Sequence, residues 1–343
     1  LRKVRKMTDT AKTDFTHRIS AHCESGSTSS LLFHYGVKAS EALVFGIGSG
    51  VFFGYFPFIK MSGSPLITYR TFPGRLMKNA AGRLGVGVKC VKFKNPEKGM
   101  EALDDMLRRG IPVCLQTAVY WLPYFPPAFR IHFDAHFIIA YGMSGNGYII
   151  SDPVMDGPVT CTREDLIRAR FSKGTFSPKG KMFRFMGAPG HIDIAAAVVK
   201  GIKEACFVML KLPVPIMGAR GIRFFANSLK NWPEKHGNRK TLLYLGNVIR
   251  LQEEFGTGGG GFRFMYAAFL QEAAAILKDD RLLDLSKRMT VIGDRWREFA
   301  ASSARICKDR ASEKDNFNLL SEILLDCAEK EHGLFRDLSE TVR

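Results

Sequence analysis

The stretch His22-Cys23-Glu24-Ser25-Gly26-Ser27-Thr28 decides how the first half of this chain is interpreted. Its small polar residues are good helix N-caps, and Leu31 and Leu32 follow, so we predict a helix over residues 27–35. A cysteine just ahead of a helix lies at the positive end of the helix dipole, close to backbone N–H groups without intrahelical partners. Both features favour the thiolate, the nucleophilic form of cysteine. Cys23 is therefore a candidate nucleophile.

A nucleophilic thiol needs a base, and a second region supplies candidates for it. This region contains the stretches Asp134-Ala135-His136-Phe137-Ile138-Ile139-Ala140-Tyr141-Gly142 and Tyr148-Ile149-Ile150-Ser151-Asp152-Pro153. Apolar runs over residues 137–141 and 147–151 predict two strands joined as a hairpin. His136 opens the first strand and Asp152 closes the second. We therefore expect the imidazole and the carboxylate to lie side by side, as a base and its orienting group require.

Each of these residues also has a structural interpretation. A lone cysteine is more often a small buried apolar residue than a nucleophile, and Asp152-Pro153 alone is typical turn chemistry. His132 and Asp134 lie close enough in sequence to compete for the roles of base and orienting group. The order of a cysteine, a distant histidine and an aspartate after a strand is that of papain-like enzymes. That order favours a Cys–His–Asp site.

The chain divides into an α/β part and a helical part. In the first part we predict a helix over residues 100–109 and further strands over 113–119 and 183–185. Apolar spacing near 3.6 then predicts helices over residues 195–203, 220–230, 241–255, 262–278, 282–308 and 316–341. We expect an α/β (α+β) domain over residues 1–188 and a mostly α-helical domain over residues 189–343.

Composition narrows the function classes. The 343 residues are 46% apolar and 24% charged, which is typical of a globular protein of two domains. The formal net charge of +17 favours an acidic partner: nucleic acid, an anionic membrane or an acidic protein. We expect no nucleic acid, because there is no zinc finger, RNP-type motif or phosphate-loop spacing. We also expect no membrane span, because glycines interrupt the uncharged stretch over residues 43–59.

The seven cysteines are scattered and never spaced as C-x-x-C. This pattern is typical neither of a disulfide framework nor of a thiolate zinc site. Free thiols, with no apolar stretch behind the basic residues 1–6, lead us to expect a cytoplasmic protein.

Several motifs resemble the butirosin biosynthesis protein H family. They are His22-Cys23 with its small neighbours, Ser40-Glu41-Ala42-Leu43-Val44-Phe45-Gly46-Ile47-Gly48-Ser49-Gly50, Ile111-Pro112-Val113, His136-Phe137-Ile138-Ile139-Ala140-Tyr141-Gly142, Ser151-Asp152-Pro153, and Glu254-Phe255-Gly256-Thr257-Gly258-Gly259-Gly260-Gly261-Phe262-Arg263. The resemblance implies a papain-like cysteine-protease fold in the N-terminal half and the family's own helical domain after it.

The resemblance also implies a reaction, namely transfer of an acyl group from a carrier-protein thioester to an amine through an acyl–cysteine intermediate. Cys23 would be the nucleophile, His136 the base and Asp152 its orienting group. The donor would be the phosphopantetheine thioester of an acidic acyl carrier protein, and the acceptor a small amine. We expect no bound cofactor, ATP or metal, because the conversion of a thioester to an amide releases free energy.

The oxyanion donor departs from the papain-like pattern. That pattern has glutamine six residues before the nucleophile, and this chain has His17 there. The backbone N–H of Cys23 is one donor, and Gln116 is a more remote substitute for the missing side chain.

Further residues are candidates for substrate binding. Gly48 and Gly50, within an aromatic-rich stretch, could line a channel for a pantetheine arm or acyl chain, although ordinary core packing explains them equally well. Glu254 and Arg263 flank the second glycine run and could hold an amine acceptor, although helix charges are usually just solvated. Two rival functions stay open, a papain-like peptidase or amidase and a non-catalytic basic binding protein, as does a homo-oligomeric state.

Overall fold

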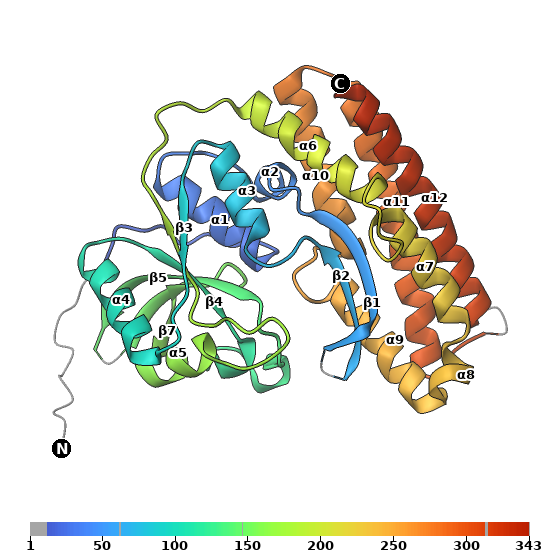
Figure 1. The fold of residues 1–343 in the computed structure, drawn as a ribbon, viewed down its shortest axis with the longest axis horizontal. Coiled ribbons are helices and arrows are strands. Elements are labelled where there is room, and N and C mark those ends of the chain that lie inside the picture. The colour runs from blue at the N-terminus through green and yellow to red at the C-terminus, as the bar shows by residue number, and fades with distance from the viewer. Residues whose placement is uncertain (1–11, 62, 146, 313–314, 343) are drawn as a thin grey trace. The chain divides into compact units, whose positions relative to one another are not determined.

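The computed structural model describes residues 12–61, 63–145, 147–312 and 315–342 of the chain (Figure 1). The chain forms two compact units. The first comprises Leu1–Glu41 and Leu84–Ile192, and the second Ala42–Arg83 and Asp193–Arg343. The chain passes from the first unit to the second for the last time after Ile192, close to the expected boundary at residue 188. However, the segment Ala42–Arg83 belongs to the second unit, so the division is not the continuous one that we expected. The basic residues 1–6 lie outside the described part.

Within the described residues, the first unit contains one six-stranded antiparallel sheet, in the order β3-β8-β4-β5-β6-β7. Its strands are β3 (Val88–Val91), β4 (Val113–Thr117), β5 (His136–Ser144), β6 (Gly147–Ser151), β7 (Val159–Thr162) and β8 (Met182–Phe185). All the strands predicted above are present. The central strands β4 and β5 are almost wholly buried, which explains why their sequences are nearly continuous apolar runs.

Three main helices complete the first unit. They are α1 (Cys23–His34), α4 (Pro96–Arg108) and α5 (Arg163–Arg170). The Asn95 side chain caps α4 by accepting a hydrogen bond from Lys98 N, and Pro96 occupies the first turn, where its missing N–H costs nothing. Leu103 and Leu107 of α4 pack against Leu115 of the sheet in one buried apolar cluster.

The second unit is mostly helical (Figure 1). Its elements are α2 (Glu41–Ile47, apart from Glu41), the antiparallel hairpin β1 (Val51–Met61) and β2 (Ser64–Arg70), and the helices α3 (Arg75–Arg83), α6 (Ile194–Leu210), α7 (Gly218–Lys230), α8 (Trp232–His236), α9 (Asn238–Glu253), α10 (Arg263–Leu277), α11 (Arg281–Cys307) and α12 (Phe317–Thr341). All six helices predicted in this half are present, with shifted ends. The hairpin joins this unit because its buried aromatic residues pack on the helices: Tyr55 contacts Phe225, and Phe53 contacts Trp296. Among the described residues, no helix is both long and apolar enough to span a bilayer.

Candidate active site

Cys23 is the first residue of α1, and only 7% of it is exposed. The helix begins four residues earlier than predicted because His22, and not a serine, is its N-cap. The Nδ1 atom of His22 accepts a hydrogen bond from Ser25 N and lies 2.8 Å from Ser25 Oγ. This cap brings the cysteine inside the first turn. The thiol is therefore closer to the positive end of the helix dipole than the sequence indicated.

The turn ahead of this helix is held by Glu41. Its carboxylate accepts hydrogen bonds from Ala21 N (2.9 Å), His22 N (2.8 Å) and Ser25 Oγ (2.9 Å). Burial raises the pKa of Glu41, and these three bonds oppose the shift. The backbone before and at the N-cap and the Ser25 hydroxyl of the first helical turn are thus tied to one side chain, which holds the start of α1 in place.

His136 and Asp152 form the pair that the hairpin pattern predicted. His136 is the first residue of β5, and Asp152 directly follows the end of β6. The His136 Nε2–H donates to Asp152 Oδ2 over 2.7 Å, and the two residues are 5% and 0% exposed. The charge of Cys23 also acts on this imidazole. The structure therefore brings the three residues together in the order thiol, imidazole and carboxylate.

The protonation of His136 reflects this arrangement. Burial alone would lower the pKa of the imidazole, because it disfavours a charged ring. The negative charges of Asp152 and Cys23 and their hydrogen bonds outweigh burial and raise the pKa of His136 to about 10. His136 therefore carries a positive charge at neutral pH.

Asp152 has two further donors that the sequence did not reveal. The hydroxyl of Tyr124 donates to Asp152 Oδ2 over 3.0 Å, and Val154 N donates to Oδ1 over 3.2 Å. Burial and the charge of Asp152 raise the pKa of Tyr124 well above its usual value, so the hydroxyl stays a donor. Together with His136, these two donors fix the orientation of the buried carboxylate. Tyr124 lies in the irregular segment between β4 and β5, where no periodic pattern marks it.

The competing residues of the same region take other positions. Asp134 accepts a hydrogen bond from Ser172 Oγ over 3.0 Å, and His132 is stacked on Tyr120 at 4.2 Å between ring centroids. Neither contact involves Cys23. Ala135, which lies between Asp134 and His136 in the sequence, does reach the thiol: its carbonyl oxygen lies 4.0 Å from Cys23 Sγ.

Neither side chain proposed as an oxyanion donor has a hydrogen to give. His17 Nε2–H donates to Met155 O over 3.0 Å, so Nδ1 accepts from the Ser151 hydroxyl over 2.8 Å. Gln116 uses both amide hydrogens, one to Asp134 O (2.9 Å) and one to Phe176 O (2.8 Å). The structure assigns both residues to holding loops. The donor that remains from the prediction is the backbone N–H of Cys23 at the start of α1.

Gly48 and Gly50 lie in the second unit, in the turn between α2 and β1. A Cβ on Gly48 would come within 2.8 Å of Leu76 Cγ, and one on Gly50 within 2.5 Å of the Phe45 ring. The backbone carbonyl of Gly48 accepts a hydrogen bond from Asn79 over 3.4 Å. Close packing therefore explains both glycines, and the expected channel role has no support in these contacts.

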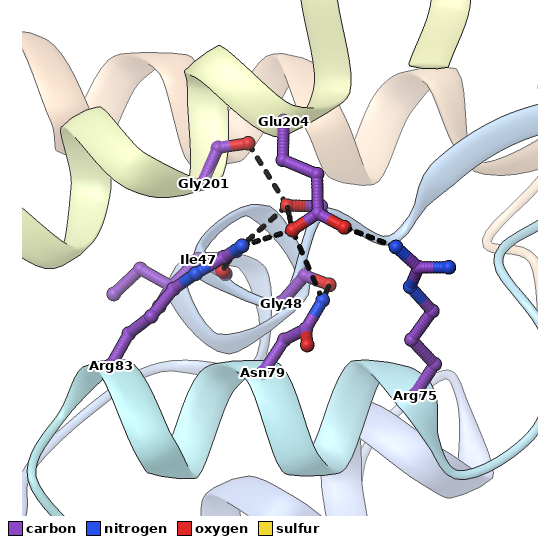
Figure 2. Close-up of polar contacts among 8 residues, drawn as sticks. Ile47, Gly48, Arg75, Asn79, Arg83, Gly201 and Glu204 are labelled. Carbon is purple, nitrogen blue, oxygen red and sulfur yellow. Dashed lines mark hydrogen bonds and ion pairs between the residues drawn. The ribbon is translucent and has the colours of Figure 1, made fainter. Parts of the chain in front are cut away.

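The same turn is fastened by a polar network centred on Glu204 of α6 (Figure 2). The carboxylate accepts hydrogen bonds from Arg75 (2.6 Å), Asn79 (3.2 Å), Ser49 Oγ (3.3 Å) and Arg83. Partial burial opposes ionisation of Glu204, but the two arginines hold its pKa below the usual value. The network joins the turn to α3 and α6, so these polar residues serve the fold of the second unit.

The candidates for holding an amine are also structural. Arg263 is fully buried and forms a two-bond ion pair with Glu331, both bonds 2.9 Å long. Trp296 Nε1–H donates to the same carboxylate over 2.7 Å. Glu254 is exposed and pairs with Arg250 one turn earlier on the helix surface. A buried, fully paired guanidinium cannot meet a substrate from solvent, so the expected role of Arg263 is corrected here.

Two family models match this chain. Residues 22–153 match the family described as "Butirosin biosynthesis protein H, N-terminal", and residues 164–338 match a "Domain of unknown function (DUF4872)". Among solved structures, one described as a C39-like peptidase from Bacillus anthracis is similar, at 15% identity and a TM-score of 0.38, over 53% of this chain and 99% of that chain. No curated protein matched the sequence.

A helix headed by a cysteine, packed on an antiparallel sheet that carries a histidine and then an aspartate, is the arrangement of papain-like cysteine enzymes. The first unit has this fold, and the second unit is helical. The second of the two family matches alone covers just over half of the sequence. The chain therefore belongs to the DUF4872 family, and its residues 22–153 match the family described as "Butirosin biosynthesis protein H, N-terminal".

Proposed function

We propose that this protein is a cysteine-dependent N-acyltransferase that moves an acyl group from a carrier-protein thioester to an amine. The observation that carries the proposal is the Cys23 thiol at the start of α1, whose charge acts on an imidazole that is itself held by Asp152, in a segment that matches the butirosin family model. Such a site performs acyl transfer through a covalent intermediate.

In the first half-reaction the Cys23 thiolate attacks the thioester carbonyl. The oxyanion that forms is stabilised by the backbone N–H of Cys23 at the helix start. The carbon–sulfur bond to the carrier's pantetheine then breaks, and the leaving thiolate takes a proton from the His136 imidazolium. The products are an acyl–cysteine and a free pantetheine thiol.

In the second half-reaction a neutral amine attacks the acyl–cysteine. His136, now neutral, takes the proton that the nitrogen loses, and Asp152 stabilises the imidazolium that results. The carbon–sulfur bond breaks, and the Cys23 thiolate returns beside the imidazolium. Water competes with the amine for the acyl group, so efficient transfer requires that the acceptor site exclude water.

The net charge of +17 supports an acidic macromolecular donor. Acyl carrier proteins are strongly acidic, and opposite charges accelerate the encounter of two proteins. The natural acceptor would be a small amine, bound after the carrier has left.

The experiment is the intact mass of the protein after brief incubation with acyl-carrier and acyl-pantetheine thioesters. We expect the wild type to gain the mass of the acyl group and Cys23→Ala to gain none. Cys90→Ala is the matched control, because Cys90 is a half-buried thiol of the same unit and should leave the adduct unchanged. Addition of amines should then discharge the acyl-enzyme faster than water does.

Two other outcomes would overturn the proposal. If no thioester gives an adduct while Cys23 is still alkylated rapidly, the site is that of a peptidase or amidase. If there is no adduct and the thiol also reacts slowly with alkylating reagents, the site is not catalytic, and a binding protein becomes the better interpretation.

A further inference from the structure

The outermost strand pair of the six-stranded sheet carries a group of cations. We call this group the basic edge. Its members lie on β3, on β8 or directly beside them: Lys89, Lys92, Lys179, Lys181 and Arg184. β3 is the last strand of the sheet, so one side of it faces no other strand among the described residues.

The charges of the basic edge repel one another in the free protein. In the β3–β8 register, Lys89 lies directly opposite Arg184, an arrangement that destabilises a strand pair. Partial burial lowers the pKa of Lys181, and the neighbouring charges of Lys92 and Lys179 lower it further. In the part of the chain that the structure describes, none of the five forms an ion pair with a carboxylate, and nearby Glu97 is paired with Arg163. The charge of buried Glu24 acts on Lys181 in the opposite sense, but no carboxylate pairs directly with any of the five cations in the described residues.

An apolar side chain lies among these charges. Met186 follows β8, two residues beyond Arg184, and therefore lies on the same face of the strand pair. It is 53% exposed, and Met186 N donates to Gly87 O, so the residue opposite it has no side chain to cover it. An exposed apolar residue beside cations is suited to an acidic protein surface that buries one apolar contact.

The basic edge is connected to the catalytic cysteine within the same unit. Lys181 Nζ donates to Gln116 Oε1 over 2.8 Å, and Gln116 Nε2 donates to Asp134 O over 2.9 Å. The next residue, Ala135, has its carbonyl oxygen 4.0 Å from Cys23 Sγ. Two hydrogen bonds and one peptide unit thus connect Lys181 of the basic edge to the carbonyl group of Ala135, which faces the thiol. Gln116, which gives no hydrogen to an oxyanion, acts here as the link.

We propose that the basic edge is the surface on which the acidic carrier protein docks. The proposal rests on the acyl transfer proposed above and adds the place of the donor. The carrier protein's carboxylates would neutralise cations that now repel one another, and its apolar residues would cover Met186. The carrier would then stand beside the loop next to Cys23, where a pantetheine arm has to deliver its thioester.

The test reverses three exposed charges of the edge in Lys89→Glu/Lys92→Glu/Lys179→Glu. The matched control reverses three exposed cations of the helical unit in Lys235→Glu/Arg239→Glu/Lys240→Glu, which changes the net charge equally. All six side chains are exposed, so both proteins should fold. The probes are an octanoyl-loaded type II acyl carrier protein and octanoyl-pantetheine, and the readout is the rate at which Cys23 gains the octanoyl mass.

We expect the ratio of the carrier-borne rate to the pantetheine-borne rate to fall at least about tenfold in the edge variant at low salt. In the control variant the ratio should change by less than about twofold, and high salt should remove the difference between the edge variant and the wild type.

Three results would overturn the proposal. If the edge variant keeps the wild-type ratio, the lysines only guard an edge strand against pairing with other sheets. If both variants lose the carrier reaction equally, net charge acts without a docking surface. If octanoyl-pantetheine does not acylate wild-type Cys23 and no carrier thioester does, the proposed function itself fails, and the docking of a donor fails with it.

Discussion

Replacing Asp152 by asparagine should lower the pKa of His136 while preserving the shape of the site. The two side chains are 2.7 Å apart, and both are buried. An opposite charge at such a distance shifts a pKa by about 1–3 units, and burial favours the upper end of that range. The pKa of His136, about 10 in the wild type, should therefore fall to about 7 in Asp152→Asn.

The assay is an NMR titration of ¹⁵N-labelled histidine between pH 5 and 11, with the His136 signal assigned by its loss in His136→Gln. Asp156→Asn is the matched control, because Asp156 is an exposed carboxylate four residues further along the chain. If Asp152→Asn titrates within about half a unit of the wild type, the carboxylate does not hold the imidazolium, and our account of the site is refuted. A midpoint that moves equally in Asp156→Asn would also refute it.

Other predictions concern stability and the turn before α1. Glu331→Gln leaves the buried Arg263 charge without compensation, so urea unfolding should show a loss of about 3–5 kcal/mol, against less than about 0.5 kcal/mol for Glu254→Gln in an exposed pair. Because the pKa of His136 is higher in the folded state than its ordinary value of 6.5, protonation stabilises the fold fully below pH 6.5, and this stabilisation declines as the pH rises to about 10. The Tm of His136→Gln should therefore depend less on pH across that window, and an identical profile would contradict the shift. Glu41→Ala removes the acceptor of three hydrogen bonds at the start of α1, so iodoacetamide should alkylate Cys23 several-fold more slowly; an unchanged rate would show that the turn keeps its shape without the Glu41 carboxylate.

Local patterns were sufficient for much of the site. The helix after Cys23 and the strands that carry His136 and Asp152 follow from N-cap residues and apolar runs, which act within a few residues of one another. A hairpin also brings its two ends together by its own geometry, so the 2.7 Å contact between imidazole and carboxylate was predictable from the order of the residues.

Other features depend on contacts between residues far apart in the chain. Gln116 and Arg263 have side chains suited to binding a substrate, yet packing commits one to loop carbonyls and buries the other against Glu331. Tyr124 reaches Asp152 from an irregular segment that no periodicity marks. The type of a polar residue indicates what its side chain can bind, but only the fold determines which of the possible partners lies within contact distance.

The sequence by itself therefore determined the α/β character of the first part, the helical second part, and the order of thiol, imidazole and carboxylate. Only the tertiary structure assigned the hairpin within Ala42–Arg83 to the helical unit and gathered five cations along one sheet edge. The physical reason is the distance along the chain over which each effect acts. Helix and strand patterns arise from neighbours in the chain, whereas burial of aromatic residues and the meeting of like charges depend on which distant segments the fold packs together.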